Sequence, residues 1–159
     1  MSTPSVEESW DSWTARTASL LAQLGPDDWV TFVVHVDSAA TVAERRAQAR
    51  KGWRRALAPP PSPPPVPDVF VQARRVEALL VLECIADAEF EGITDLTPRQ
   101  LDTLVTLGWE RTGDDPDFGA TFDPSEAADA ADAAELLAAS LRGVLGADSP
   151  SRVDVRRSP

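Results

Sequence analysis

The sequence is short of several residue types on which particular kinds of protein depend. Its 159 residues include one cysteine and one histidine, so neither an internal disulfide nor a cysteine-rich zinc site is expected. No apolar run approaches the roughly 20 residues that a membrane-spanning helix needs. The N-terminus is acidic and lacks the apolar stretch of a secretion signal, so we expect a cytoplasmic protein.

Basic residues are also scarce relative to acidic ones. Fifteen Lys and Arg stand against 26 Asp and Glu, which gives a net charge of −11. Because a net-negative surface repels phosphate, we expect no nucleic-acid partner. Residues 41–57 are an exception, with six basic side chains and one acidic side chain. This segment leaves an anionic-surface binder open as an alternative, although a solvated insertion is the simpler interpretation.

Residues suited to catalysis or metal binding are few. His35 and Cys84 each fall in a predicted strand, but no third group is present to orient such a pair. The acidic cluster over 114–126 lacks the ligand offsets of a calcium-binding loop, since Pro116 and Phe118 occupy its third and fifth positions. We therefore expect no enzyme, and no catalytic, cofactor-binding or metal-binding residues.

Three stretches have the periodicity and end signals of helices. The first covers residues 5–24, with a capping box predicted at its start and Gly25 after its end. The second begins with Thr97 as N-cap, followed by Pro98, and ends at Gly108. The third covers residues 123–146 and carries an Ala- and Leu-rich stripe.

Five stretches have the composition of strands. Residues 29–36 and 68–74 alternate between two faces. Residues 77–86 are almost continuously apolar, which predicts a central strand covered on both faces. A hairpin turn is predicted near residues 75–76. Two more strands are predicted at residues 109–112 and 118–122, on either side of an acidic turn.

This order predicts an α+β fold. The elements follow as helix, strand, insertion, strand, strand, helix, strand, strand, helix. Tight turns between strands imply an antiparallel sheet of about five strands with helices packed on it. We expect a single domain over residues 1–146, with a basic and proline-rich insertion at 38–67. Residues 147–159 are small, polar and charged, which predicts a disordered tail.

One segment of the chain is similar to a known family. Residues 96–110, Leu-Thr-Pro-Arg-Gln-Leu-Asp-Thr-Leu-Val-Thr-Leu-Gly-Trp-Glu, resemble the TY-Chap family of chaperone-like domains, which is related to type III secretion chaperones and to YbjN. The strand around Phe70-Val71-Gln72 and the closing Ala134-Glu135-Leu136-Leu137 helix also fit. The connection at 38–67 is longer than the family's usual one.

The resemblance implies a peptide-binding or protein-binding module without chemistry or cofactor. We expect a client protein or peptide segment as the partner, lying across the sheet face or along a helix groove. The candidate contact residues, which the resemblance itself does not supply, are Trp53, Phe70, Gln72 and Arg74. Related chaperones pair, so a homodimer through an apolar face of the first or last helix is also expected. The alternative is an acidic inhibitor of the immunity or antitoxin kind, which would mask a basic partner protein.

Overall fold

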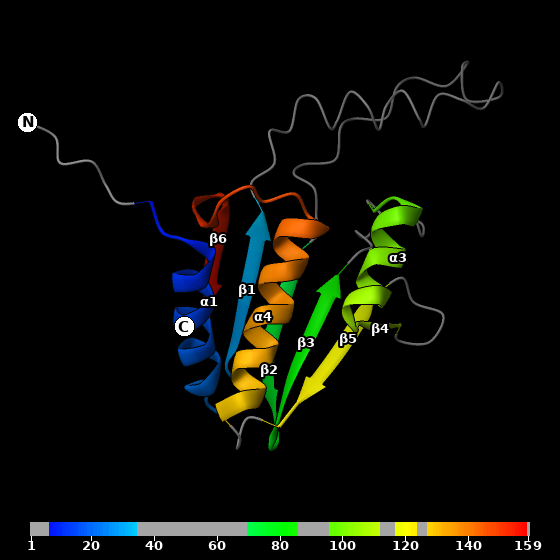
Figure 1. Ribbon diagram of the computed structural model, residues 1–159. Coiled ribbons are helices and arrows are strands. Elements are labelled where there is room, and N and C mark those ends of the chain that lie inside the picture. The colour runs from blue at the N-terminus through cyan, green and yellow to red at the C-terminus, as the bar shows by residue number, and fades with distance from the viewer. Residues whose placement is uncertain (1–6, 35–69, 86–95, 112–116, 124–126, 159) are drawn as a thin grey trace, which may run out of the picture.

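A layer of helices packs on one face of an antiparallel sheet in the computed structural model of the chain (Figure 1). The structure describes residues 7–34, 70–85, 96–111, 117–123 and 127–158. The helices within these ranges are α1 (Trp10–Ala22), α3 (Pro98–Leu107) and α4 (Ala127–Gly143). The strands are β1 (Trp29–Val34), β2 (Phe70–Val76), β3 (Leu79–Ile85), β4 (Glu110–Arg111), β5 (Phe118–Phe122) and β6 (Val153–Arg157). The predicted α+β class is confirmed.

The six strands lie in the order β4-β5-β3-β2-β1-β6, and every neighbouring pair is antiparallel. The predicted hairpin joins β2 and β3, where Val76 pairs with Leu79. Its turn lies at Glu77, which has a φ of 54°, and not at residues 75–76. The strand β3 is central, as predicted.

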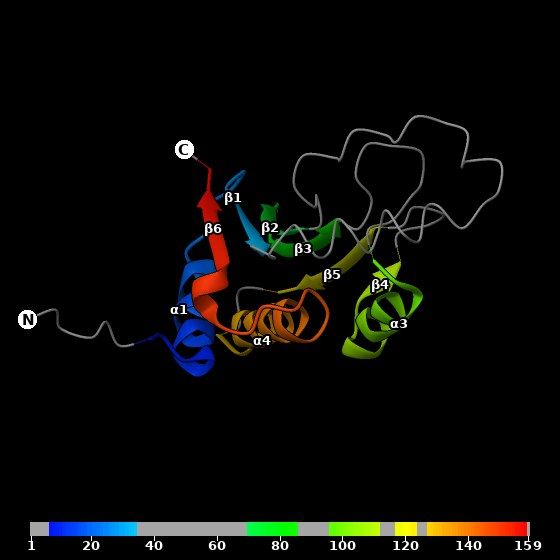
Figure 2. The ribbon, with the colours of Figure 1, turned by 90° about the horizontal axis from the view of Figure 1, so that it is seen from above.

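The helices α1, α4 and α3 lie on the same side of the sheet (Figure 2). The prediction that β3 is covered on both faces is therefore wrong for the described residues, whose helices cover one face. The long apolar run of β3 reflects its central place, while Leu79 on the uncovered side keeps 43% of its surface exposed.

Local capping explains where α3 begins and ends. The hydroxyl of Thr97 accepts from the backbone N–H of Gln100, and the Gln100 side chain accepts from the N–H of Thr97 at 2.8 Å. Gly108 ends the helix in the left-handed region at φ 106°. Both predicted signals are confirmed, because each depends on residues only a few positions apart.

The helix α1 is shorter at its start than the sequence predicted. It begins at Trp10, and Ser9 caps it by accepting from the N–H of Ser12 at 3.2 Å. Glu8 is then outside the helix and pairs with Arg16 at 2.8 Å. A second capping residue close to the predicted one thus determines the start.

The core lies between the helix layer and the facing side of the sheet. Trp13 of α1 packs edge-on against Phe32 of β1, with ring centroids 5.8 Å apart. Trp109, which follows α3, donates its indole N–H to the hydroxyl of Ser140 on α4 at 2.8 Å. This hydrogen bond satisfies a buried donor and ties the end of α3 to α4.

The end of the chain corrects the predicted tail. Residues 150–152 form a short 3-10 helix, η2 (Pro150–Arg152), and β6 follows it and pairs with β1. Val153 and Val155 are half-buried against the core, and Arg157 pairs with Asp28 at 3.3 Å. Among the described residues the sheet therefore has six strands, and the fold continues beyond residue 146.

Some predictions fall outside the described residues. These are the insertion at 38–67, its basic segment at 41–57 and most of the acidic turn at 113–117. The single-domain organisation of the chain stays a prediction.

Candidate functional site

The two faces of the sheet differ sharply in what they present. On the face toward the helices, the side chains of Val30, Phe32, Val71 and Leu82 are fully buried. Residues between them in sequence point the other way, because successive side chains of a strand alternate. No helix of the described residues lies on that other side (Figure 2). We call it the open face.

The open face is formed by alternate residues of the four inner strands. Its members are Trp29, Thr31, Val33, Phe70, Gln72, Arg74, Val76, Leu79, Val81, Glu83, Gly119 and Thr121. All of them are half-buried or exposed. Strand pairing arranges them in rows that cross the sheet, because directly paired residues point to the same side.

The central row is polar. Thr31 pairs with Gln72, Gln72 with Glu83, and Glu83 with Gly119. The guanidinium of Arg74 donates to the carboxylate of Glu83 at 3.1 Å. Hydroxyl, amide, carboxylate and guanidinium groups thus lie within a short span, and together they can both donate and accept hydrogen bonds.

Apolar side chains gather at one end of the open face, beside the β2–β3 turn. Trp29, Val76 and Leu79 retain 40%, 39% and 43% of their surface exposed. Trp29 pairs across the strands with Arg74, and Val76 pairs with Leu79. Three large exposed apolar side chains near one another are typical of a contact surface rather than of an ordinary solvated sheet.

The structure places three of the four predicted binding residues together. Phe70, Gln72 and Arg74 lie at alternate positions of β2 and share the open face. Trp53 lies outside the described residues. The binding role of all four stays a prediction.

Trp29, Val76 and Leu79 were not among the contact residues predicted from the sequence. Alternation along β1 already placed Trp29 with Thr31, on the side away from Val30 and Phe32. What it could not show is which side the helices cover. That depends on contacts between segments far apart in the chain.

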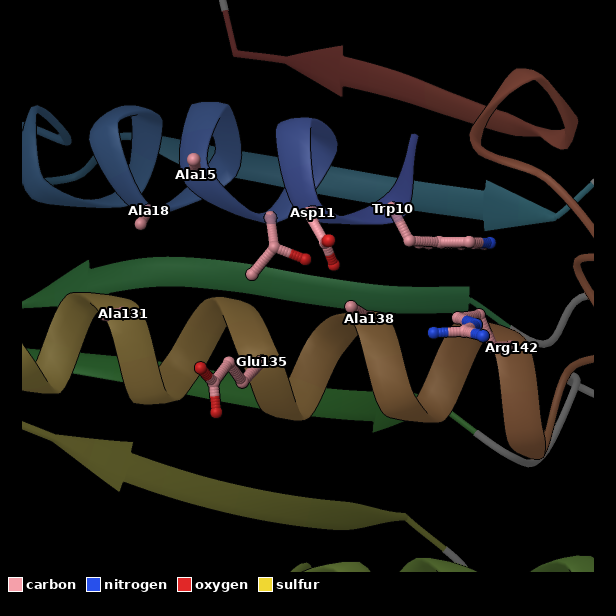
Figure 3. A pocket seen from close by; sticks show the side chains of 9 residues that line it. Trp10, Asp11, Ala15, Ala18, Ala131, Glu135, Ala138 and Arg142 are labelled. Atoms are coloured by element: carbon pink, nitrogen blue, oxygen red, sulfur yellow. The ribbon is translucent and has the colours of Figure 1, made fainter. Parts of the chain in front are cut away.

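A hollow lies between α1 and α4, with a volume of about 460 Å³. Figure 3 shows the side chains that line it, from the face of the molecule that carries the helices. Ala15, Ala18, Ala131 and Ala138 line it with small side chains. At one end, the guanidinium of Arg142 lies 5.5 Å from the ring centroid of Trp10.

The single thiol is poorly placed for chemistry. Cys84 is fully buried on the helix-facing side of β3. Burial first, and the nearby charge of Asp117 second, together raise the pKa of its thiol from 9.0 to about 12. Because the thiolate is the nucleophilic form, this group is unreactive at neutral pH. His35, the other candidate, lies outside the described residues.

The described residues offer neither a metal-binding cluster nor a membrane-spanning helix. Among the described residues, no three His, Cys, Asp or Glu side chains lie close enough together to hold a metal ion. Within the same ranges, no helix is long and apolar enough to cross a membrane.

Comparison with known proteins identifies the family. No curated protein and no solved structure matches the chain. A protein family does match, and over nearly all of the sequence. The matched residues are 3–159, and the chain belongs to the TY-Chap3 family, T3SS (YopN, CesT) and YbjN peptide-binding chaperone 3.

Proposed function

We propose that this protein is a non-enzymatic module that binds a segment of a client protein on the open face of its sheet. The observation that carries the proposal is the side of the sheet that none of the described helices covers, where exposed apolar side chains lie beside a polar row. The family's description as a peptide-binding chaperone supports it. Such binding needs no cofactor, and the cytoplasm remains the predicted location.

The apolar end of the open face supplies the driving force. The exposed part of Trp29, 40% of its surface, amounts to on the order of 100 Å², and covering it contributes about 2 kcal/mol. Val76 and Leu79 add further area on the same side of the turn. A client segment with apolar side chains would cover this end first.

The polar row supplies orientation. Thr31 and Gln72 are neighbours across the strands, and their hydroxyl and amide groups can bond the main chain of an extended segment. Arg74 and Glu83 already pair with each other, so they do not leave an uncompensated charge beneath the client. We infer that the segment crosses the strands, with apolar contacts at the turn and polar contacts along the row.

The experiment places a photo-crosslinking amino acid at single positions and exposes the protein to the lysate of its host. Thr31 reports on the open face and Ala15 on the hollow between α1 and α4. Thr106, exposed on α3, is the matched control. We expect client crosslinks from position 31 and none above background from position 106.

The two surfaces give different outcomes. Client crosslinks from position 15 and none from position 31 would move the binding site to the helix layer and contradict the proposal. Crosslinks of equal strength from all three positions would show contact without a defined site, which also contradicts it.

A further inference from the structure

We propose that the outer edge of β6 pairs antiparallel with the same edge of a second copy of this chain. The strand order ends at β6, and Figure 2 shows it at the border of the sheet. It is five residues long, whereas β4 at the opposite border has two. An edge strand presents backbone donors and acceptors that another strand can use.

The hydrogen bonds at the start of β1 show which way the backbone of β6 faces. The N–H of Ser158 donates to the carbonyl of Trp29 at 2.9 Å. Backbone groups alternate along a strand, so the N–H and C=O groups of Asp154 and Arg156 face β1 as well. Those of Val153, Val155 and Arg157 face outward, away from β1. A bond on the other side of β1 agrees, because the N–H of Arg75 donates to the carbonyl of Asp28 at 3.2 Å.

The outward backbone groups match one another about Val155. In a two-fold pairing centred there, Val155 meets Val155 of the second copy and exchanges both hydrogen bonds with it. The N–H of Arg157 meets the carbonyl of Val153 of the second copy. The N–H of Val153 is already donated to the carbonyl of Pro150, so only its carbonyl is needed.

Side-chain charge selects the same register. With Val155 at the centre, Asp154 lies opposite Arg156 of the second copy, and Arg156 lies opposite Asp154. Within one chain these two side chains already bridge at 2.8 Å, so they lie on the same side of the sheet. Opposite charges at facing positions favour the pairing of two strands.

The neighbouring registers are disfavoured by the same residues. Centring the pairing on residue 154 brings two aspartates face to face, and centring it on residue 156 brings two arginines together. Charged residues at an edge often prevent pairing. Here one charge of each sign flanks the central valine. Of the pairings centred on residues 154, 155 and 156, only the one centred on Val155 places opposite charges at facing positions.

The proposed pair has a definite shape. Antiparallel neighbours in a sheet keep the same faces on the same side, so the two helix layers lie together and the two open faces form one wider surface. The interface is self-complementary, as a two-fold dimer requires. This inference does not depend on what the open face binds.

The test measures the mass of the full-length protein in solution by light scattering over a range of concentrations. We expect a dimer for the unchanged chain and a dissociation constant at least about tenfold higher for Asp154→Arg and for Arg156→Asp, since each places like charges opposite each other. Mixing the two variants should restore dimers, because position 154 of each then faces an opposite charge at position 156 of the other.

The mixture is the decisive arm. Each single variant has lost the bridge within its own chain, so recovery on mixing can come only from contact between copies. A monomeric unchanged chain, single variants that stay dimeric, or a mixture that stays monomeric would each overturn the proposal.

Amide hydrogen exchange of the unchanged chain gives a second measurement that needs no variant. The amides of Val155 and Arg157 should become protected as concentration rises, while those of Asp154 and Arg156 stay protected throughout. Dimerisation with no change at Val155 and Arg157 would place the contact elsewhere and overturn the inference.

Discussion

At the scale of single residues, burial decides the chemistry of Cys84. Composition marks it as the one thiol of the chain, and a predicted strand contains it. Its complete burial raises the pKa of the thiol to about 12. The residue therefore acts as a small apolar side chain of the core. Because its pKa differs between the folded and unfolded states, its deprotonation changes the free energy of unfolding.

This thiol should make the free energy of unfolding fall at alkaline pH. The folded-state pKa is about 12 and the reference value is 9.0, so the folded state holds the proton more tightly. Stability is thus fully present below pH 9 and falls as the pH rises toward 12. Urea unfolding should show a loss of about 1.4 kcal/mol per pH unit above about pH 9.5.

The control is Cys84→Ala, in which this slope should disappear. Other side chains contribute little to the pH dependence in this range, because the chain has no tyrosine and a single lysine, Lys51, while arginine stays charged. A slope that survives in the variant would show that another group titrates.

At the scale of elements, local chemistry defines α3. Thr97 and Gln100 are three positions apart, and Gly108 follows the last turn directly. Signals of this kind depend on neighbours in sequence, so they could be predicted without knowing the rest of the fold. The strand β6 is the opposite case, because its partner β1 lies more than 100 residues earlier.

Two glycines offer a matched test of backbone conformation. An added Cβ would meet nothing within 4 Å at Gly108 or at Gly143, so space does not distinguish them. Gly108 has a φ of +106°, whereas Gly143 closes α4 without a positive φ. We expect Gly108→Ala to destabilise the fold by about 1 kcal/mol and Gly143→Ala to stabilise it by about 0.5 kcal/mol, measured by urea unfolding. Equal effects would contradict a conformational origin.

A chain ending at Ser149 tests the contribution of β6. Removing it uncovers the edge of β1 and removes the half-buried Val153 and Val155 from the core. We expect a loss of roughly 2–3 kcal/mol in unfolding free energy. The measurement is made at a concentration where the chain is monomeric. An unchanged unfolding midpoint would mean that these residues behave as the tail that composition predicted.

At the scale of the whole molecule, the division of the sheet into two faces is the central feature. Val71 and Gln72 are adjacent in β2, yet one is fully buried beneath the helices and the other lies half-buried on the open face. Stability and binding should therefore separate along a single strand.

The pair Val71→Ala and Gln72→Ala tests that separation. Val71→Ala should cost about 2 kcal/mol of unfolding free energy, because it opens a cavity in the core. Gln72→Ala should change stability by less than about 0.5 kcal/mol and reduce client capture. Urea unfolding and pull-down from host lysate measure the two effects. Both variants are compared at a temperature where they are folded. If Val71→Ala lost client capture and Gln72→Ala kept it, the assignment of the faces would be contradicted.

The local structure of this protein follows from short stretches of its sequence. Periodicity and caps placed α3, β1, β5 and the β2–β3 hairpin, and alternation along β2 put Phe70, Gln72 and Arg74 on one side. Each of these depends on residues within about one turn or one hairpin of each other, where steric and hydrogen-bonding preferences act directly.

Packing between distant segments determines which side of the sheet the helices cover and which conformation the last residues adopt. Covering one face required α1 and α4 to pack together over strands distant in sequence, and that exposed Trp29, Val76 and Leu79 on the other. The charged segment at 153–157 forms a strand because it pairs with the edge of β1 and because its two valines pack against the core. Such choices depend on burial and pairing between distant segments, and these arise only when the whole chain has folded.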